Sequence, residues 1–390
     1  MPKVLRIINR FNIGGPTYNA TFLTRFLSNE FETLLIGGLP EEGESDSLHI
    51  PEEYGVNPTI IKELKRKPNF ISDREAYRKI KEIILEFKPD IVHTHASKAG
   101  ALGRRAAYAC NVPVIVHTFH GHVFHSYFSP LKTRLYKHIE QRLAKKSTAI
   151  IAISEIQKNE LSNIHKICSK DKIETIPLGF DLNKFQLNLS ENRFTIRNEY
   201  KINDNEVAVA IIGRLTKIKN HTFFLDVVEK LLESKITNAK FFIVGDGELK
   251  TEIEERAGVI NSKFGEHIIL TSWIKDIATF NAGMDIICLT SDNEGTPVSL
   301  IEAQASNVPV ISTNVGGVKD IVLEGKTGYI VEKGNLNEYA EKLGILIKNK
   351  ELRLEFSNNG WGFVKDKFHY TRLVKDIETL YMKLLKNKNA

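Results

Sequence analysis

The stretch MDIICLTSDNEGTPVSLIE, residues 284–302, places an apolar strand, a short loop and a helix one after another. Thr296 is predicted to cap the helix through its hydroxyl, and Pro297 to take the first helical position, where a missing N–H costs nothing. The free N–H groups of that turn favour a phosphate or diphosphate. Glu294 and Glu302 flank this anion site. A diphosphate between two acceptors of hydroxyl groups is the pattern that a nucleotide-sugar requires.

Short β-rich runs alternate with segments of helical period along almost the whole chain, which predicts parallel sheets covered by helices. Strands are expected at 3–9, 32–37, 90–95, 113–119, 148–153, 207–213, 240–245, 267–271, 284–290, 308–313 and 327–331. Pro177 and Gly179 punctuate a linker at 175–185. These patterns predict two doubly wound α/β domains, 1–180 and 181–368. The amphipathic segment 369–390 is expected to pack back on the first of them.

Length and composition fit an ordinary globular protein. The chain has 390 residues, of which 42% are apolar and 26% charged, and no stretch reaches the roughly 18 apolar residues that a membrane span needs. The first residues, MPKVLRIINR, alternate like a strand and do not resemble a signal peptide. A cytoplasmic location is expected, with action at the inner face of the membrane as a further expectation. Cys110, Cys168 and Cys288 are expected to be reduced.

The positive charge is concentrated in the first half, because residues 1–180 carry 26 Lys and Arg against 19 Asp and Glu. Two basic clusters stand out there: Lys62, Lys65, Arg66, Lys67, Arg74, Arg78, Lys79 and Lys81, then Lys132, Arg134, Lys137, Arg142, Lys145 and Lys146. They are either solvated helix faces or a surface for anionic membrane or a lipid-phosphate acceptor. Aromatic segment 123–131 precedes the second cluster and either enters the membrane interface or packs in the protein. Nucleic acid is not expected, because no stacking aromatics are interleaved.

The segment GRLTKIKNH, residues 213–221, follows the apolar run VAVAII directly. Arg214 and Lys219 are therefore expected on a strand-to-helix loop at the carboxyl edge of a sheet, where a planar guanidinium and a point charge would suit a diphosphate. Further along, VGDGEL at 244–249 ends another strand in a glycine-rich turn, which either lets a ligand approach the backbone or is a plain turn.

Taken in order, GRLTKIKN, VGDGEL, TSWIKDI and SDNEGTPVSLIEAQASNVPVISTNVGGVKDIV resemble the donor domain of family 4 retaining glycosyltransferases with the GT-B fold. The resemblance implies that Glu294 accepts sugar hydroxyls, that Glu302 accepts ribose hydroxyls, and that Arg214 and Lys219 hold the diphosphate. In TSWIK, 271–275, Trp273 or Ile274 would pack on the nucleobase, although ordinary packing explains Trp273 equally well. The donor-binding residues implied are Gly14, Gly15, Gly213, Gly245, Ile274, Gly295, Thr296, Pro297, Val298 and Glu302.

The first half, through DIVHTHASKAGALGRRAAYACNVPVIVHTFHGHVF at 90–124, resembles members that assemble bacterial surface polysaccharides. His120 corresponds to the active-site histidine near the donor sugar and joins Glu294, Arg214 and Lys219 as a catalytic candidate. The acceptor side is expected to include His93, His95, Ser97, Lys98 and Asn19. Asn19 stands where many relatives have His. Ser97 is predicted to cap the helix that begins SKAGALGRR.

A metal site is not expected. His117 and His120 should point to opposite faces of their strand, and no Cys or carboxylate is spaced to complete a ligand set. Asp292 and Glu294 mimic the metal motif of the other large glycosyltransferase fold, but the family resemblance already accounts for Glu294. Neither a metal nor another cofactor is therefore predicted.

The interpretation is a retaining transferase that moves a sugar from a nucleotide diphosphate, most simply a UDP-sugar, to a glycan or lipid-linked glycan in bacterial polysaccharide synthesis. A GT-B epimerase or nucleotide-sugar hydrolase, and a non-catalytic nucleotide-sugar-binding protein, remain as alternatives. An NAD-dependent oxidoreductase is disfavoured, because no Gly-x-Gly-x-x-Gly follows the first strand.

Overall fold

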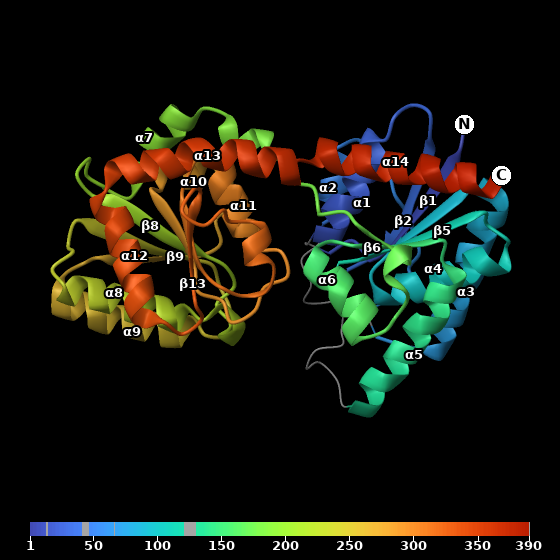
Figure 1. Ribbon diagram of the computed structural model, residues 1–390, viewed down its shortest axis with the longest axis horizontal. Coiled ribbons are helices and arrows are strands. Elements are labelled where there is room, and N and C mark those ends of the chain that lie inside the picture. Colours follow the sequence, from blue (N-terminus) through green and yellow to red (C-terminus); the bar gives the residue numbers. More distant parts are fainter. Residues whose placement is uncertain (13–14, 41–46, 66, 121–129, 390) are drawn as a thin grey trace. The chain divides into compact units, whose positions relative to one another are not determined.

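The computed structural model describes residues 1–12, 15–40, 47–65, 67–120 and 130–389. The chain divides into two compact units (Figure 1). The first contains Met1–Phe180 and Phe368–Ala390, and the second contains Asp181–Lys367. The second unit thus begins at the residue where the second domain is expected to begin, and the last helix belongs to the first unit.

The described residues of the first unit form a parallel seven-stranded sheet in the order β3-β2-β1-β4-β5-β6-β7. Its strands are β1 (Lys3–Arg10), β2 (Glu32–Gly38), β3 (Thr59–Ile60), β4 (Ile91–His95), β5 (Val114–Phe119), β6 (Ala149–Ala152) and β7 (Ile173–Thr175). The five strands expected from the sequence are confirmed. The edge strands β3 and β7 are additional, and their two and three residues are too short to show an apolar period.

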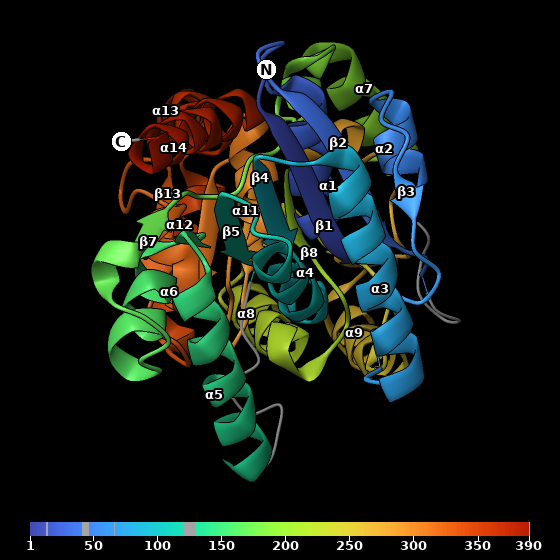
Figure 2. The same ribbon diagram turned by 90° about the vertical axis from the view of Figure 1, so that its right-hand side faces the viewer.

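Helices cover both faces of this sheet (Figure 2). They are α1 (Gly15–Phe26), α2 (His49–Glu53), α3 (Phe70–Phe87), α4 (Ser97–Ala109), α5 (Pro130–Lys146), α6 (Glu155–Asn159) and α14 (Tyr370–Asn389). Leu5 and Ile7 of β1 pack with residues of α3 and α4 on one face. Val4 of β1 packs with residues of α1 and α14 on the other.

Helix α14 carries the apolar face that its sequence period predicts. Its buried residues are Leu373, Val374, Ile377, Leu380, Tyr381 and Leu384. They join the core formed by Val4 of β1, Ile91 of β4 and Val116 of β5. The final helix is therefore an integral layer of the first unit.

The second unit contains a parallel six-stranded sheet in the order β10-β9-β8-β11-β12-β13. Its strands are β8 (Val207–Ile212), β9 (Ala239–Val244), β10 (Ile268–Thr271), β11 (Ile286–Leu289), β12 (Val310–Thr313) and β13 (Gly328–Val331). Its helices are α7 (Leu189–Glu199), α8 (His221–Glu233), α9 (Lys250–Phe264), α10 (Ile277–Gly283), α11 (Val298–Ala305), α12 (Leu336–Lys348) and α13 (Lys350–Phe368). All six expected strands are confirmed. Both units are doubly wound α/β structures, so ligands are expected at the carboxyl edges of their sheets.

Candidate functional site

The carboxyl edge of the second sheet holds a lysine and a glutamate in direct contact. Lys219 lies in a single 3₁₀ turn, Lys217–Lys219, after β8, and Glu294 lies in the loop after β11. Their Nζ and Oε1 atoms are 2.5 Å apart. The hydroxyl of Ser291, which is fully buried, donates to the same carboxylate oxygen at 2.5 Å. The two central strands of the sheet therefore bring together the cation and the carboxylate that the sequence separates by 75 positions.

Backbone contacts around this pair fix its position. The Thr290 hydroxyl donates to the carbonyl oxygens of Lys219 and Asn220 at 3.2 and 2.9 Å. The Thr313 hydroxyl donates to the carbonyl of Ser291 at 2.7 Å. Side chains that follow β11 and end β12 thereby hold both partners of the ion pair.

Glycine is required where a second loop meets the Glu294 loop. Gly316 has φ +48°, and a Cβ there would lie 1.7 Å from the Glu294 carbonyl oxygen. A Cβ on Gly317 would lie 2.1 Å from the carbonyl oxygen of Gly295. The two backbones can approach this closely only because neither position carries a side chain.

Helix α11 begins later than the sequence predicts. It runs from Val298 to Ala305, with Pro297 as its N-cap residue and no side-chain cap. The predictions of Thr296 as N-cap and Pro297 as first helical residue are therefore wrong. Pro297 has extended backbone, φ −72° and ψ 92°, which places Thr296 one residue too far from the first turn for capping.

Arg214 lies on the same edge as Lys219, in the loop after β8. Its side chain is exposed and pairs with no carboxylate among the described residues. The loop is packed against the turn after β9, because Gly245 has φ +146° and its missing Cβ would lie 2.0 Å from the Gly213 carbonyl oxygen. Arg214 thus projects from a tightly held backbone with its five N–H donors unused by protein carboxylates.

Glu302 lies in α11 and is half-buried. Burial disfavours its charged form and raises its pKa to about 7, although the charge of Lys184 opposes this shift. A carboxyl group with such a pKa changes its charge near neutral pH, so any ligand that bonds to the ionised form must shift this equilibrium.

The nucleobase loop predicted at 271–275 follows β10 directly. Trp273 is 53% exposed, whereas Ile274 is half-buried. With this exposure, the indole is not part of the core of its unit. A flat apolar ring held in solvent beside a sheet edge is suited to stacking on a base.

In the first unit, histidines gather on the face of the sheet covered by α14. The Nδ1 atom of His95 and the Nε2 atom of His120 are 2.9 Å apart. The His93 ring bonds to the Tyr381 hydroxyl through Nδ1 at 2.6 Å and to the Thr118 hydroxyl through Nε2 at 2.7 Å. Burial lowers the pKa of His120 to about 4, so this ring is neutral at physiological pH.

His117 lies on the opposite face from His120, as the strand alternation predicts. Its Nδ1 atom is 2.9 Å from the Thr94 hydroxyl. Among the residues that the structure describes, no group of three or more His, Cys, Asp or Glu side chains could hold a metal ion.

The remaining acceptor-side candidates differ in burial and in the groups that they contact. His93 is fully buried with both ring nitrogens bonded, so it lies inside the unit and lines no surface. Ser97 is not a cap: Ala96 is the N-cap residue, with φ 63° and ψ 161°, so the chain has already turned before Ser97. Lys98 pairs with Asp73 of α3 at 2.5 Å. Asn19 is buried in α1.

The glycine-rich loop is described only in part. Gly15 begins α1, and a Cβ there would make an ordinary 3.6 Å contact with Leu178. Gly14 lies outside the described residues, as do residues 121–129 with most of the aromatic segment.

Several residues at these two sites are missed by sequence reasoning. Ser291 could have been noticed as a hydroxyl three positions before Glu294 on the same loop. Arg6 interrupts the apolar run of β1, and a charged residue in such a run is a signal on its own. Buried charges are rare, and Arg6 is fully buried. In the sequence, Tyr381 is one more apolar position of an amphipathic helix. The hydrogen bond between its hydroxyl and His93, 288 positions away, leaves no local signal.

Comparison with known families assigns both halves of the chain. The family model described as Glycosyltransferase Family 4 matches residues 14–184. The model described as Glycosyl transferases group 1 matches residues 192–361, which contain Arg214, Lys219, Glu294 and Glu302.

Individual relatives and a solved structure agree with these matches. The capsular polysaccharide biosynthesis glycosyltransferase CapM of Staphylococcus aureus is 30% identical over 351 residues, covering 87% of this chain and 88% of CapM. The UDP-Gal:alpha-D-GlcNAc-diphosphoundecaprenol alpha-1,3-galactosyltransferase of Escherichia coli is 29% identical over 342 residues, covering 85% of each chain. The crystal structure of Anabaena HepE in complex with UDP has a TM-score of 0.80 at 17% identity, covering 97% of this chain and 100% of HepE. The chain belongs to the family 4 glycosyltransferases, and its two doubly wound units are the two halves of the GT-B fold.

Proposed function

We propose that the protein transfers a sugar from a UDP-sugar to a lipid-linked glycan in bacterial polysaccharide synthesis, with retention at the anomeric carbon. The observation that supports this most directly is the Lys219–Glu294 pair at the carboxyl edge of the second sheet. A cation for the diphosphate and an acceptor for sugar hydroxyls lie side by side there. The Escherichia coli relative is named for a UDP-galactose donor and a diphosphoundecaprenol-linked acceptor, which supports both substrate classes.

The proposed chemistry needs no covalent intermediate on the protein. The bond between the anomeric carbon and the diphosphate oxygen breaks, the acceptor oxygen bonds to the same face of that carbon, and its proton passes to the leaving diphosphate. Arg214 and Lys219 stabilise the charge that develops on the diphosphate, which is where preorganised cations contribute most. Glu294 and His120 position the hexose, and Glu302 holds the ribose.

The diphosphate role of the two cations makes a direct prediction. Arg214→Ala and Lys219→Ala should each weaken UDP binding by about 10- to 100-fold, because a charge-assisted hydrogen bond contributes roughly 1.5–3 kcal/mol. Isothermal titration with UDP measures this, and circular dichroism checks the fold. Lys217→Ala, in the same 3₁₀ turn, is the matched control and should bind UDP normally. Unchanged UDP affinity in both site variants would remove the diphosphate assignment.

We also propose that transfer needs no divalent metal, since Arg214 and Lys219 supply positive charge at the diphosphate. Turnover should therefore stay within about twofold of its original value after EDTA treatment. The measurement is sugar transfer in EDTA, with Mn²⁺ or Mg²⁺ added back. A loss of transfer that either ion restores would contradict the proposal.

The first unit exposes apolar side chains at the starts of two helices, of which α5 is basic. In α5, Leu131 and Leu135 are 82% and 58% exposed and lie among Lys132 and Arg134. In α3, Phe70 is 82% exposed. Figure 2 shows that the starts of α3 and α5 lie at the same end of the unit.

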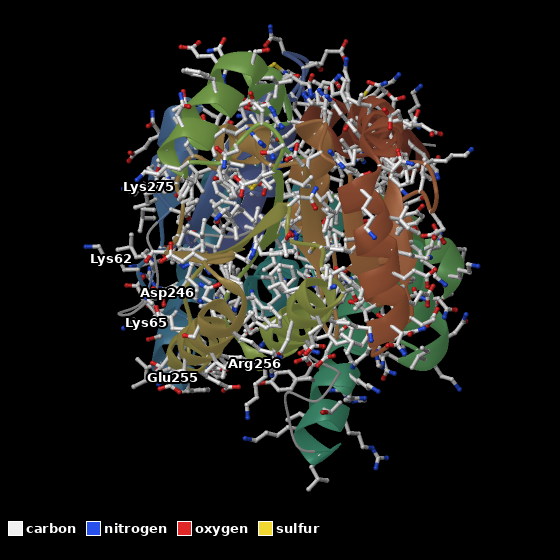
Figure 3. The ribbon with its side chains drawn as sticks, turned by 90° about the vertical axis from the view of Figure 1, so that its left-hand side faces the viewer. Lys62, Lys65, Asp246, Glu255, Arg256 and Lys275 are labelled. Carbon is white, nitrogen blue, oxygen red and sulfur yellow. The ribbon has the colours of Figure 1, made fainter. Side chains whose placement is uncertain are left out.

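Further basic residues precede α3. Figure 3 shows the side chains of Lys62 and Lys65 extending into solvent. Among the helices of the described residues, none is long and apolar enough to cross a membrane.

We propose that this end of the unit binds reversibly to the anionic inner face of the membrane, where lipid-linked acceptors are found. Apolar side chains would enter the interface and each cation would contribute roughly 1 kcal/mol.

Liposome flotation tests this surface. The protein should float with vesicles that contain anionic lipid, and less so as salt rises, because exposed charges are screened. Lys132→Ala/Arg134→Ala should reduce flotation several-fold. Lys145→Ala/Lys146→Ala removes the same charge from the other end of α5 and serves as the control. Equal flotation with neutral vesicles, or none with any vesicle, would leave these residues as ordinary solvated surface.

A further inference from the structure

Arg6 is a fully buried cation in the centre of the first sheet. Its side chain lies on the same face of β1 as Val4, toward α1 and α14, and opposite His93 in the register with β4. Its Nη1 atom donates to the Thr24 hydroxyl at 3.3 Å. Apart from an interaction with the Tyr381 hydroxyl, its Nε and Nη2 atoms have no hydrogen-bond partner among the described residues, and no carboxylate there pairs with it. A buried charge without an ionic partner lowers the free energy of unfolding, so we look for a function that explains why Arg6 is kept here.

The charge of Arg6 orders the neighbouring hydroxyl. Arg6 interacts electrostatically with Tyr381, and this contact favours a Tyr381 oxygen that faces the guanidinium. The Tyr381 O–H then points at His93 Nδ1, 2.6 Å away, so that nitrogen accepts. A neutral His93 must therefore carry its proton on Nε2, which donates to the Thr118 hydroxyl at 2.7 Å.

The same charge acts on the next histidine along β4. The His93 and His95 ring centroids are 4.3 Å apart, and His95 is fully buried. Its pKa is well below the usual range, first because of burial and then because of its titratable neighbours, His93 first and Arg6 among them. His95 is therefore neutral and carries one proton, on either Nδ1 or Nε2.

The partners of His95 decide between these two positions. Nδ1 is 2.9 Å from His120 Nε2, whereas the buried Nε2 has no partner among the described residues. Each arrangement leaves one buried N–H without an acceptor, on His95 Nε2 or on His120 Nδ1, so the nearby charge decides. A proton on His95 Nε2 would lie in the field of Arg6, which acts on His95. A lone pair on Nε2 is instead stabilised by that field. The favoured arrangement puts the proton on Nδ1, which donates to His120 Nε2.

We propose that the buried Arg6 charge, acting through His95, fixes His120 as the tautomer that carries its proton on Nδ1. His120 then accepts from His95 and keeps an N–H on Nδ1 as a hydrogen-bond donor for a ligand oxygen. Its own Nδ1 has no partner among the described residues. Under the function proposed above, that oxygen belongs to the donor sugar. Arg6 and His95 are positioning residues in this scheme and touch no substrate.

The tautomer can be measured without any ligand, so the test does not depend on the proposed function. The full chain is labelled with ¹⁵N-histidine, and long-range ¹H–¹⁵N correlation at pH 7 reports which ring nitrogen carries the proton. The His120 signals are those lost in His120→Gln. We expect a protonated Nδ1 and an unprotonated Nε2. A proton on Nε2 of His120 would overturn the proposal.

The role of Arg6 is tested in the same spectra. Arg6→Met should move part of the His120 population to the Nε2 tautomer, whereas Arg6→Lys keeps a cation and should keep the Nδ1 proton. If Arg6→Met does not fold, Arg6→Gln serves instead: it removes the charge, keeps hydrogen-bond donors and should shift the His120 population in the same direction. An unchanged His120 spectrum in folded Arg6→Met would show that Arg6 does not set the tautomer.

A transfer assay separates this positioning role from simple packing. His95→Phe should lower kcat at least tenfold with little change in donor KM. His95→Asn, whose amide N–H2 takes the place of Nδ1–H, should recover most of the activity. His117→Asn is the matched control, a buried histidine on the other face of the same sheet, and should transfer normally. Equal activity of His95→Phe and wild type, with the tautomer as expected, would disprove the proposed contact of His120 with the sugar but leave the tautomer assignment intact.

Discussion

Glu294→Gln is expected to lower turnover by about 100-fold while UDP affinity stays the same or increases. The carboxylate accepts sugar hydroxyls in the proposed complex, and a charged hydrogen bond worth about 3 kcal/mol corresponds to two orders of magnitude in rate. UDP lacks the hexose and does not make these bonds. The substitution also releases Lys219 from its 2.5 Å ion pair, so its charge becomes fully available to the diphosphate. Steady-state transfer kinetics and titration with UDP give the two quantities.

Ser291→Ala should have a smaller effect than Glu294→Gln in the same direction. It removes one hydrogen bond to the Glu294 carboxylate and leaves the charge in place, so turnover should fall by about tenfold or less. If Glu294→Gln instead weakens UDP binding strongly and leaves turnover of the saturated enzyme unchanged, then Glu294 serves the nucleotide and not the sugar.

The second large effect is a pH dependence of UDP affinity that comes from Glu302. Its pKa is raised to about 7, and ribose hydroxyls bond to the ionised form, so UDP binding competes with a proton. Affinity should rise by about tenfold between pH 6 and pH 8, as linkage to a single group of this pKa requires. Titrations in buffers of different ionisation enthalpy should also detect proton release near pH 7. A flat pH profile in wild type, or the same slope in Glu302→Gln, would contradict the ribose assignment.

The unliganded protein should show the opposite trend in stability. The folded pKa of Glu302 lies above its ordinary value of 4.5, so the unfolded chain loses this proton first as pH rises. The free energy of unfolding should therefore fall between about pH 4.5 and pH 7, by roughly 2 kcal/mol from this group after allowance for its partial exposure. Glu302→Gln should have a higher melting temperature than wild type at pH 8, and the difference should vanish near pH 4.

The strands, and the positions of the donor-side candidates in the loops that follow them, were predictable because their signals are local. A buried parallel strand such as VAVAII is apolar throughout, and a loop residue that follows it must lie at the carboxyl edge. Arg214, Lys219 and Glu294 are all placed in this way, each in a loop that follows a strand. The order of strands brings β8 and β11 together, which explains why two residues that are distant in sequence meet.

Other features depend on contacts that a local pattern does not encode. Thr296 and Ser97 both look like helix caps, but the extended Pro297 and the turn at Ala96 decide where each helix begins. His93 was expected to line the acceptor side, but it is fully buried, and its ring bonds to the Tyr381 hydroxyl of α14. The sequence shows that α14 has an apolar face; it does not show which sheet covers that face.

The discontinuous first unit has a consequence for synthesis on the ribosome. Helix α14 begins 190 positions after Phe180, the end of the first segment of that unit. At a translation rate of about 5–20 residues per second, roughly 10–40 s pass before that helix is complete. During this interval Val4, Ile91 and Val116 lack their cover, and Arg6 lacks the hydroxyl of Tyr381. The unit that is started first is therefore the one that is finished last, and its nascent sheet is the part of the chain that most needs protection by chaperones.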